Sequence, residues 1–217
     1  MKPNAAQVRP PLSFFSWLED EDYIVKSPAR RIKHVRSPKK IKSVFSDEDL
    51  ELLRQNNNNL RDTAIINILA STGMRVGELV RLKIKDINIS ERECLVTGKG
   101  DKQRIVYFDA RTKIRLEKYL DSREDRKEAL FIPLKGSGPK LSINTVEIRL
   151  KELGKELNIQ RVHPHKFRRT MATNAIDKGM PIEQVQKLLG HERIDTTMHY
   201  ALVNQNNVKV SHRKYLE

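Results

Sequence analysis

The side chains with the strongest chemical character gather toward the C-terminal end of the chain. His165 and Arg168 stand three positions apart, His191 follows, and Tyr200 comes nine positions after His191. A phenol can act as a nucleophile, while cations and imidazoles stabilise a phosphate under attack and move its protons. This combination predicts an enzyme that breaks and rejoins a nucleic-acid backbone through a tyrosine.

Two upstream segments extend this set of residues. Arg75 follows Gly73 in the run Ser71–Leu79, and Lys99 lies between two glycines in a turn. A guanidinium group suits the work because its fork of donors can clamp phosphate oxygens and stays charged. Lys99 at a hairpin tip could swing to the leaving 5′ oxygen and donate a proton, with Lys102 and Arg104 as alternatives for this role.

Tyr200 needs help from its surroundings to act as a nucleophile. The ordinary pKa of a phenol is about 10, so only about one molecule in a thousand is ionised near pH 7. His165, His191 or the arginines could supply the base or the positive field. Tyr215 is the rival phenol, but the nine-residue distance between His191 and Tyr200 favours Tyr200.

The charge balance points to a polyanionic partner. The 217 residues include 42 Lys+Arg and 28 Asp+Glu, for a net charge of +14. Nucleic acid is the simplest such partner, although ribosomal and membrane-surface proteins share this composition. The single cysteine, Cys94, is interpreted as a buried packing residue that suits a reducing cytoplasm. Without a long apolar run, we expect no membrane span and a cytoplasmic, DNA-associated protein.

A metal centre is the alternative interpretation of the histidines. Four of them could be imagined as ligands of a metal-dependent nuclease: His163, His165, His191 and His199. No cysteine or carboxylate cluster accompanies them, so we expect neither metal nor cofactor. Glu78 is interpreted as orienting Arg75 rather than as a metal ligand.

Capping signals and periodicity predict an α+β fold that is mainly helical. Ser46 and Asp49 open a short helix that the Asn56–Asn59 tract ends, and Gly73 ends a helix over 60–72. Strands near 85–89, 93–97 and 104–108 predict a small three-stranded antiparallel sheet. The remaining helices are expected at 111–120, 143–157, 165–178 and 181–190, then a short one that Asp195 caps and that carries Tyr200, and a last one within 203–217.

The chain divides into three predicted regions. Residues 1–25 contain a polar, Pro-rich lead and an apolar helix near 12–23, which is interpreted as the last helix of an N-terminal core-binding domain. Residues 26–42 hold eight basic and no acidic residues and are expected to follow DNA phosphates or to act as an extended tether. Residues 43–217 form the predicted catalytic domain with a C-terminal helix.

From about Lys42 onward, the chain resembles the tyrosine recombinase family of phage-type integrases and Xer-type resolvases. Thr72–Leu79 resembles the family's first arginine motif, and Gly98–Gly100 resembles the hairpin that carries its lysine. Pro164–Arg169 resembles the box that holds its histidine and second arginine. The Leu188–His191 and Thr196–Tyr200 segments resemble the closing histidine and the nucleophile.

The resemblance implies a specific reaction. Tyr200 would attack a DNA phosphate to form a 3′-phosphotyrosine and a free 5′ hydroxyl, without metal or ATP. The other roles it implies are stabilisation of the phosphorane by Arg75 and Arg168, general acid catalysis by Lys99, acid/base catalysis by His165, and a hydrogen bond to the phosphate from His191. It also implies self-association on DNA in a tetrameric synapse, with the C-terminal helix docking in trans.

Two departures from the family pattern stand out. Arg169 occupies a position where many relatives have a second histidine. Before the catalytic domain, the sequence has only something like the last core-binding helix. If the chain is complete, weak and salt-sensitive DNA binding with poor site selectivity is expected; a fragment of a longer recombinase is the alternative. Two other functions stay open at this point: a type IB-like topoisomerase that uses the same attack, and a truncated DNA-binding relative without recombination activity.

Overall fold

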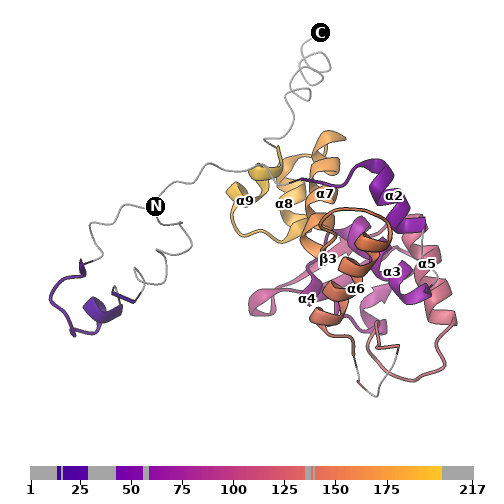
Figure 1. The fold of residues 1–217 in the computed structure, drawn as a ribbon, viewed down its shortest axis with the longest axis horizontal. Coiled ribbons are helices and arrows are strands. Elements are labelled where there is room, and N and C mark those ends of the chain that lie inside the picture. The colour runs from indigo at the N-terminus through magenta and orange to yellow at the C-terminus, as the bar shows by residue number, and fades with distance from the viewer. Residues whose placement is uncertain are drawn as a thin grey trace, which may run out of the picture. The chain divides into compact units, whose positions relative to one another are not determined.

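The computed structural model describes residues 14–15, 17–28, 43–55, 59–134, 138 and 140–201, apart from the side chains of Lys99, His199 and Ala201. The chain splits into two compact units, residues 1–42 and 43–217, and each is treated by itself (Figure 1). Three predictions fall outside the described residues: the polar lead at 1–11, most of the basic linker, and the C-terminal helix within 203–217.

The second unit combines helices with one small sheet. Its helices are α2 (Asp47–Gln55), α3 (Leu60–Thr72), α4 (Val76–Leu79), α5 (Ala110–Asp121), α6 (Ile143–Glu156), α7 (Pro164–Asp177), α8 (Ile182–Leu189) and α9 (Ile194–Ala201). The strands β1 (Ile87–Asn88), β2 (Glu93–Thr97) and β3 (Gln103–Tyr107) pair antiparallel in chain order. The predicted α+β class and three-stranded sheet are confirmed. No helix in the described part of the chain is long and apolar enough to span a bilayer.

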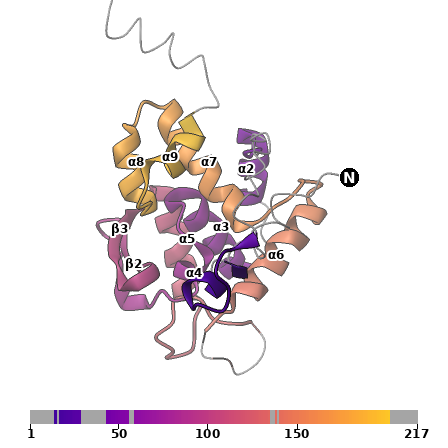
Figure 2. The same cartoon turned by 90° about the vertical axis from the view of Figure 1, so that its left-hand side faces the viewer.

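Helix α3 lies at the centre of this unit and contacts α2, α5 and α7 (Figure 2). Apart from Leu60 at its first position, its apolar side chains are buried on every side, as expected of a central helix. Gly73 ends it with a φ of 61°, in the left-handed region that glycine tolerates. Both predicted ends are therefore confirmed. Asn59 adds an unforeseen feature, because its side chain caps α3 by accepting from the backbone N–H groups of Arg61 and Asp62.

The sheet places one row of side chains in the core. Cys94 faces Val106 in the register and both are buried, while Leu95 faces Ile105 on the exposed side. The first strand is shorter than predicted, since residues 84–86 form a 3₁₀ turn. The Asp86 carboxylate closes this turn by accepting from the Lys83 N–H at 2.9 Å, so only Ile87 and Asn88 pair with β2.

The three C-terminal helices pack on one another, and Figure 1 shows them in orange to yellow. Their predicted bounds hold closely for α7 and α8. The prediction that Asp195 caps the helix of Tyr200 is wrong, because α9 already begins at Ile194. Asp195 lies in the first turn of α9, where its carboxylate interacts favourably with the positive end of the helix dipole. It also pairs with Arg193 at 3.0 Å.

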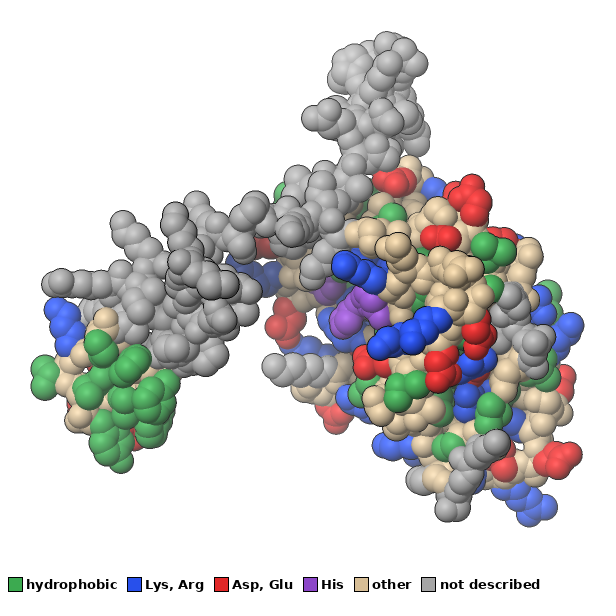
Figure 3. Space-filling view, in the orientation of Figure 1, with side chains coloured by type: hydrophobic (Ala, Val, Ile, Leu, Met, Phe, Trp, Pro, Cys, Tyr) green, Lys and Arg blue, Asp and Glu red, His purple; other side chains and the backbone are tan. Residues whose placement is uncertain are grey.

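The N-terminal unit presents aromatic side chains. Residues 14–15 and 17–20 are helical, within the predicted apolar helix. The Trp17 ring lies 6.3 Å from Phe14 and 5.8 Å from Tyr23 between centroids. These side chains are exposed, and Figure 3 shows hydrophobic side chains gathered on this unit.

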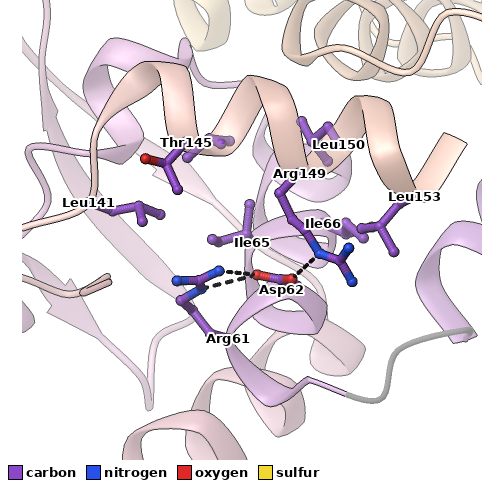
Figure 4. A pocket seen from close by; sticks show the side chains of 10 residues that line it. Arg61, Asp62, Ile65, Ile66, Leu141, Thr145, Arg149, Leu150 and Leu153 are labelled. Carbon is purple, nitrogen blue, oxygen red and sulfur yellow. Dashed lines mark hydrogen bonds and ion pairs between the residues drawn. The ribbon is translucent and has the colours of Figure 1, made fainter. Parts of the chain in front are cut away.

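A buried aspartate ties α6 to α3 (Figure 4). One carboxylate oxygen of Asp62 accepts from the Arg61 guanidinium at 2.7 Å and 3.0 Å, and the other accepts from Arg149 Nε at 2.7 Å. Asp62 is only 3% exposed. A small cavity beside it is lined by both arginines and by apolar residues of the two helices, and none of the predicted site residues reaches it. This cluster therefore belongs to the packing of the domain.

Replacing Asp62 with alanine should destabilise the fold strongly, since it leaves a buried guanidinium without its carboxylate. We expect the free energy of unfolding to fall by about 3–5 kcal/mol, measured by denaturant-induced unfolding. Asp121→Ala, at an exposed position on α5, is the matched control and should change the value by less than about 0.5 kcal/mol. Equal stability of the two variants would contradict this account.

Candidate active site

The C-terminal end of α8 gathers three arginines. The last carbonyl groups of a helix have no donor within the helix, and they carry its negative dipole end. Gly190 turns the chain away with a φ of 63°. Guanidinium groups from three other elements supply the missing donors: Arg104 bonds the Leu188 oxygen at 2.8 Å, Arg168 the Leu189 oxygen at 2.6 Å, and Arg75 the Gly190 oxygen at 3.3 Å. This arrangement concentrates positive charge at one point.

Glu78 is the carboxylate that balances part of this charge. Its Oε1 accepts from Arg75 Nη1 at 3.0 Å and from Arg104 Nη1 at 2.8 Å, while Oε2 accepts from Arg104 Nη2 at 2.9 Å and from the Arg75 backbone N–H at 2.8 Å. Burial alone would raise the pKa of Glu78, but the hydrogen bonds from Arg104 and Arg75 outweigh it and lower the pKa. The predicted contact between Glu78 and Arg75 is present.

Arg168 is the most deeply buried of the three arginines, at 3% exposure. Its Nη1 also donates to the Gly73 carbonyl at 2.8 Å, so this side chain joins the end of α3 to the end of α8. Burial, followed by the charge of Arg75, lowers the pKa of Arg168 to about 10. The guanidinium therefore stays charged at neutral pH, and backbone carbonyls hold it in place.

His191 follows directly after the α8 turn. Its Nδ1 lies 2.9 Å from the hydroxyl of Thr197, a fully buried residue of α9. The imidazole ring is nearly parallel to the Tyr200 ring, with 6.2 Å between centroids. Burial, followed by the charges of Arg168 and Arg75, lowers the pKa of His191 to about 4. The imidazole is therefore neutral at pH 7, and in the free protein it is a weak base.

His165 and Tyr200 lie around the same arginines. His165 is in the first turn of α7 with its side chain exposed, and partial desolvation together with the Arg168 charge lowers its pKa. Tyr200 is half-buried on α9 against a small apolar cluster between α7 and α8. Its phenol is close enough to Arg168 and Arg169 to act on them electrostatically. Burial lowers the pKa of both arginines, and the interaction with Tyr200 raises it. Figure 3 shows histidine side chains next to lysine and arginine side chains on one face.

The Lys99 hairpin approaches from the sheet. Residues Lys99–Asp101 form a 3₁₀ turn between β2 and β3, and the Gly98 N–H donates to the Lys102 carbonyl at 2.8 Å. Gly98 sits against the acidic centre of the site, since a Cβ on it would lie 3.6 Å from Glu78 Oε1. The backbone thus places Lys99 beside the site, while its side chain is outside the described part. Of the alternatives, the exposed Lys102 pairs with Glu192.

The structure thus brings Arg75, Arg168 and His191 together and places His165 and Tyr200 next to them. Sequence reasoning missed two positions: Arg104, weighed only as a rival of Lys99, and Thr197. No signal in the sequence pointed to either position, because both contacts depend on how separate elements pack. Within the described residues, no group of three His, Cys, Asp or Glu side chains could hold a metal ion.

Comparisons with known proteins agree with this geometry. The model of the phage integrase family matches residues 43–207. The chain belongs to the phage integrase family of tyrosine recombinases.

Individual relatives extend the match beyond the family model. The chain is 35% identical over 211 residues to the tyrosine recombinase XerC of Leptospira interrogans, covering 93% of this chain and 68% of the relative. It is 32% identical over 185 residues to XerA of Pyrococcus horikoshii, covering 84% of this chain and 65% of the relative. A crystal structure of XerA recombinase superposes with a TM-score of 0.72 at 29% identity, covering 99% of this chain and 77% of that one. The chain thus spans about two thirds of the length of these two relatives.

The depressed pKa of His191 predicts a loss of stability in acid. In the unfolded chain, His191 binds a proton below its ordinary pKa of about 6.5. In the folded chain, it binds this proton only near pH 4. Stability is therefore full above pH 6.5 and falls as the pH drops toward 4. We expect the His191 imidazole resonances to titrate with a midpoint well below 6, measured by NMR with His191→Gln for assignment. The same variant should show a smaller decrease in melting temperature between pH 7 and 4.5. A midpoint at 6.5 or above would overturn the assigned environment.

Proposed function

We propose that Tyr200 is the nucleophile with which this tyrosine recombinase cuts and rejoins DNA strands at specific sites. The phenol attacks a phosphodiester, forms a bond to phosphorus as a 3′-phosphotyrosine, and expels the 5′ oxygen, which takes up a proton. A 5′ hydroxyl from another strand reverses the step, so bond energy is kept and no ATP is required. The observation that carries this proposal is the convergence of Arg75, Arg168 and His191 beside Tyr200.

Arg75 and Arg168 stabilise the pentavalent transition state in different ways. The Arg75 side chain is 40% exposed and spends only part of its five N–H donors on Glu78 and Gly190, so the rest can clamp phosphate oxygens. Arg168 contributes its positive charge from a buried position, in which backbone carbonyls hold the guanidinium in place. A donor of this kind typically contributes about 10²–10³ in rate.

The histidines respond to the substrate. Burial, followed by the arginine charges, lowers the pKa values of both His191 and His165 in the free protein. A phosphate anion offsets these charges, so each imidazole becomes more basic when DNA is bound. This change lets His165 exchange the phenol proton and lets His191 hydrogen-bond the phosphate. Lys99, on the neighbouring hairpin, protonates the leaving 5′ oxygen.

Two alternatives from the sequence are disfavoured. The match to Xer recombinases over most of the chain supports strand exchange rather than the relaxation performed by a type IB-like topoisomerase. A binding-only relative would not need a charged, preorganised site of this kind.

Double-stranded DNA is the proposed partner. Two solved structures with the same fold support this proposal. They are XerH site-specific recombinase bound to palindromic difH substrate, with a TM-score of 0.75, and the Tn1549 transposon integrase in complex with a circular intermediate DNA, with a TM-score of 0.74. They are 22% and 18% identical to this chain. We further propose that residues 43–217 are the catalytic domain and that the basic residues of 26–42 follow the DNA backbone. Protomers assemble as a tetramer on DNA through the C-terminal residues. The protein acts in the cytoplasm, in association with DNA.

The test is capture of the covalent intermediate. The protein is incubated in EDTA with nicked duplexes of randomised sequence, and covalent complexes are isolated under denaturing conditions and sequenced. The wild type should yield a covalent product on a defined sequence, because release of the short nicked strand prevents religation. Tyr200→Phe should yield none, since it lacks the attacking oxygen.

Tyr215→Phe is the matched control, because it removes the rival phenol and should leave the product unchanged. A product that survives Tyr200→Phe and is lost in Tyr215→Phe would reassign the nucleophile. Tight binding with no covalent product from the wild type would favour the binding-only relative.

A further inference from the structure

Arg104 has no role in the reaction described so far, yet it is the most completely engaged arginine of the site. It lies on β3 opposite Val96, and its side chain is 14% exposed. Its Nη1 and Nη2 donate to the two oxygens of Glu78 at 2.8 Å and 2.9 Å, and its Nε donates to the Leu188 carbonyl at 2.8 Å. All three nitrogen atoms of the guanidinium are thus bonded to protein.

The surroundings of Arg104 leave little freedom for another side chain. A Cβ on Gly190 would lie 3.1 Å from its Cδ and Nε, so the guanidinium packs directly on the turn that ends α8. The two parallel bonds to Glu78 require a planar fork of donors, which lysine lacks. On the opposite side, a Cβ on Gly98 would lie 3.9 Å from Nη1, so the base of the hairpin rests on the same ion pair.

Three catalytic elements therefore meet at one side chain. Through Glu78, Arg104 fixes Arg75, because the same carboxylate holds the Arg75 guanidinium and its backbone N–H. Through the Leu188 carbonyl, it fixes the α8 end that receives Arg168 and precedes His191. As a residue of β3, it anchors the strand that leaves the Lys99 turn.

We propose that Arg104 is a positioning residue of the recombination reaction, which acts through Glu78 and the end of α8 to hold the arginine clamp and the lysine hairpin in register. This inference rests on the proposed function. Arg104 is distinguished from a phosphate ligand by its low exposure and by its bonds to protein at every nitrogen. Arg75, at 40% exposure, is the group left open to the substrate.

The experiment compares single-turnover cleavage of the selected nicked duplex by the wild type and by variants at saturating protein. Arg104→Met should lower the cleavage rate constant by about 10–100-fold, since the loss of one preorganised donor set costs on this order. The dissociation constant for DNA should change by less than about threefold. Arg104→Lys, which keeps the charge and guards against a folding failure, should retain most of the rate defect because it cannot form the fork.

A double-mutant cycle tests the path through Glu78. Glu78→Gln alone should slow cleavage, and adding Arg104→Met to it should slow cleavage by less than a further factor of about three, because coupled residues are not additive. Arg126→Met, an exposed arginine on the loop after α5, makes the same chemical change outside the site and should leave the rate constant within about twofold of the wild type.

Several outcomes would overturn the inference. A weakened DNA affinity with a reduced salt dependence at unchanged rate constant would make Arg104 a DNA contact. A lower melting temperature and a smaller active fraction with a normal rate constant would make it a structural residue only. Full additivity with Glu78→Gln would remove the proposed path. Failure of the proposed function itself is distinguishable, because the wild type would then form no covalent product.

Discussion

The contact on which the site depends is the one between the end of α8 and three guanidinium groups. A short helix that ends in a left-handed glycine leaves carbonyl oxygens without donors inside the domain. Cations from β3, α7 and the start of α4 satisfy them, so elements that are distant in sequence are fixed at one point. The bonds that complete the fold of this helix thus also place the groups that we propose to act on phosphate.

The site carries more positive than negative charge. Glu78 neutralises part of the charge of Arg75 and Arg104, while Arg168 is held by neutral carbonyls. Burial, followed by this uncompensated field, lowers the pKa of His191, and the field favours an incoming anion. In the proposed reaction, a substrate phosphate therefore meets a preorganised field and does not have to reorganise its surroundings, which is the main source of rate in sites of this type.

The sequence predicted the features that local chemistry determines. Gly73 and Gly190 marked helix ends because few other residues adopt a positive φ. The order and spacing of several short motifs singled out Arg75, Arg168 and Tyr200, which the structure places in one region. The pairing of Arg104 with Glu78 was beyond reach, because it depends on strand register and on the approach of α8. Two other differences come from local ambiguity in the sequence. Four consecutive asparagines do not reveal that Asn59 caps α3. A shift of one residue in the start of α9 moves Asp195 from the capping position into the first turn.

The shared carboxylate of Glu78 has a consequence for how such a chain can change over generations. Since it serves two arginines at once, loss of Glu78 leaves the largely buried Arg104 guanidinium without its carboxylate, whereas loss of either arginine still leaves Glu78 one partner. A replacement at position 78 must therefore suit both arginines, although Arg75 lies at the start of α4 and Arg104 on β3. Position 78 is thus the least replaceable of the three, because a change there acts on the helix and on the sheet at once.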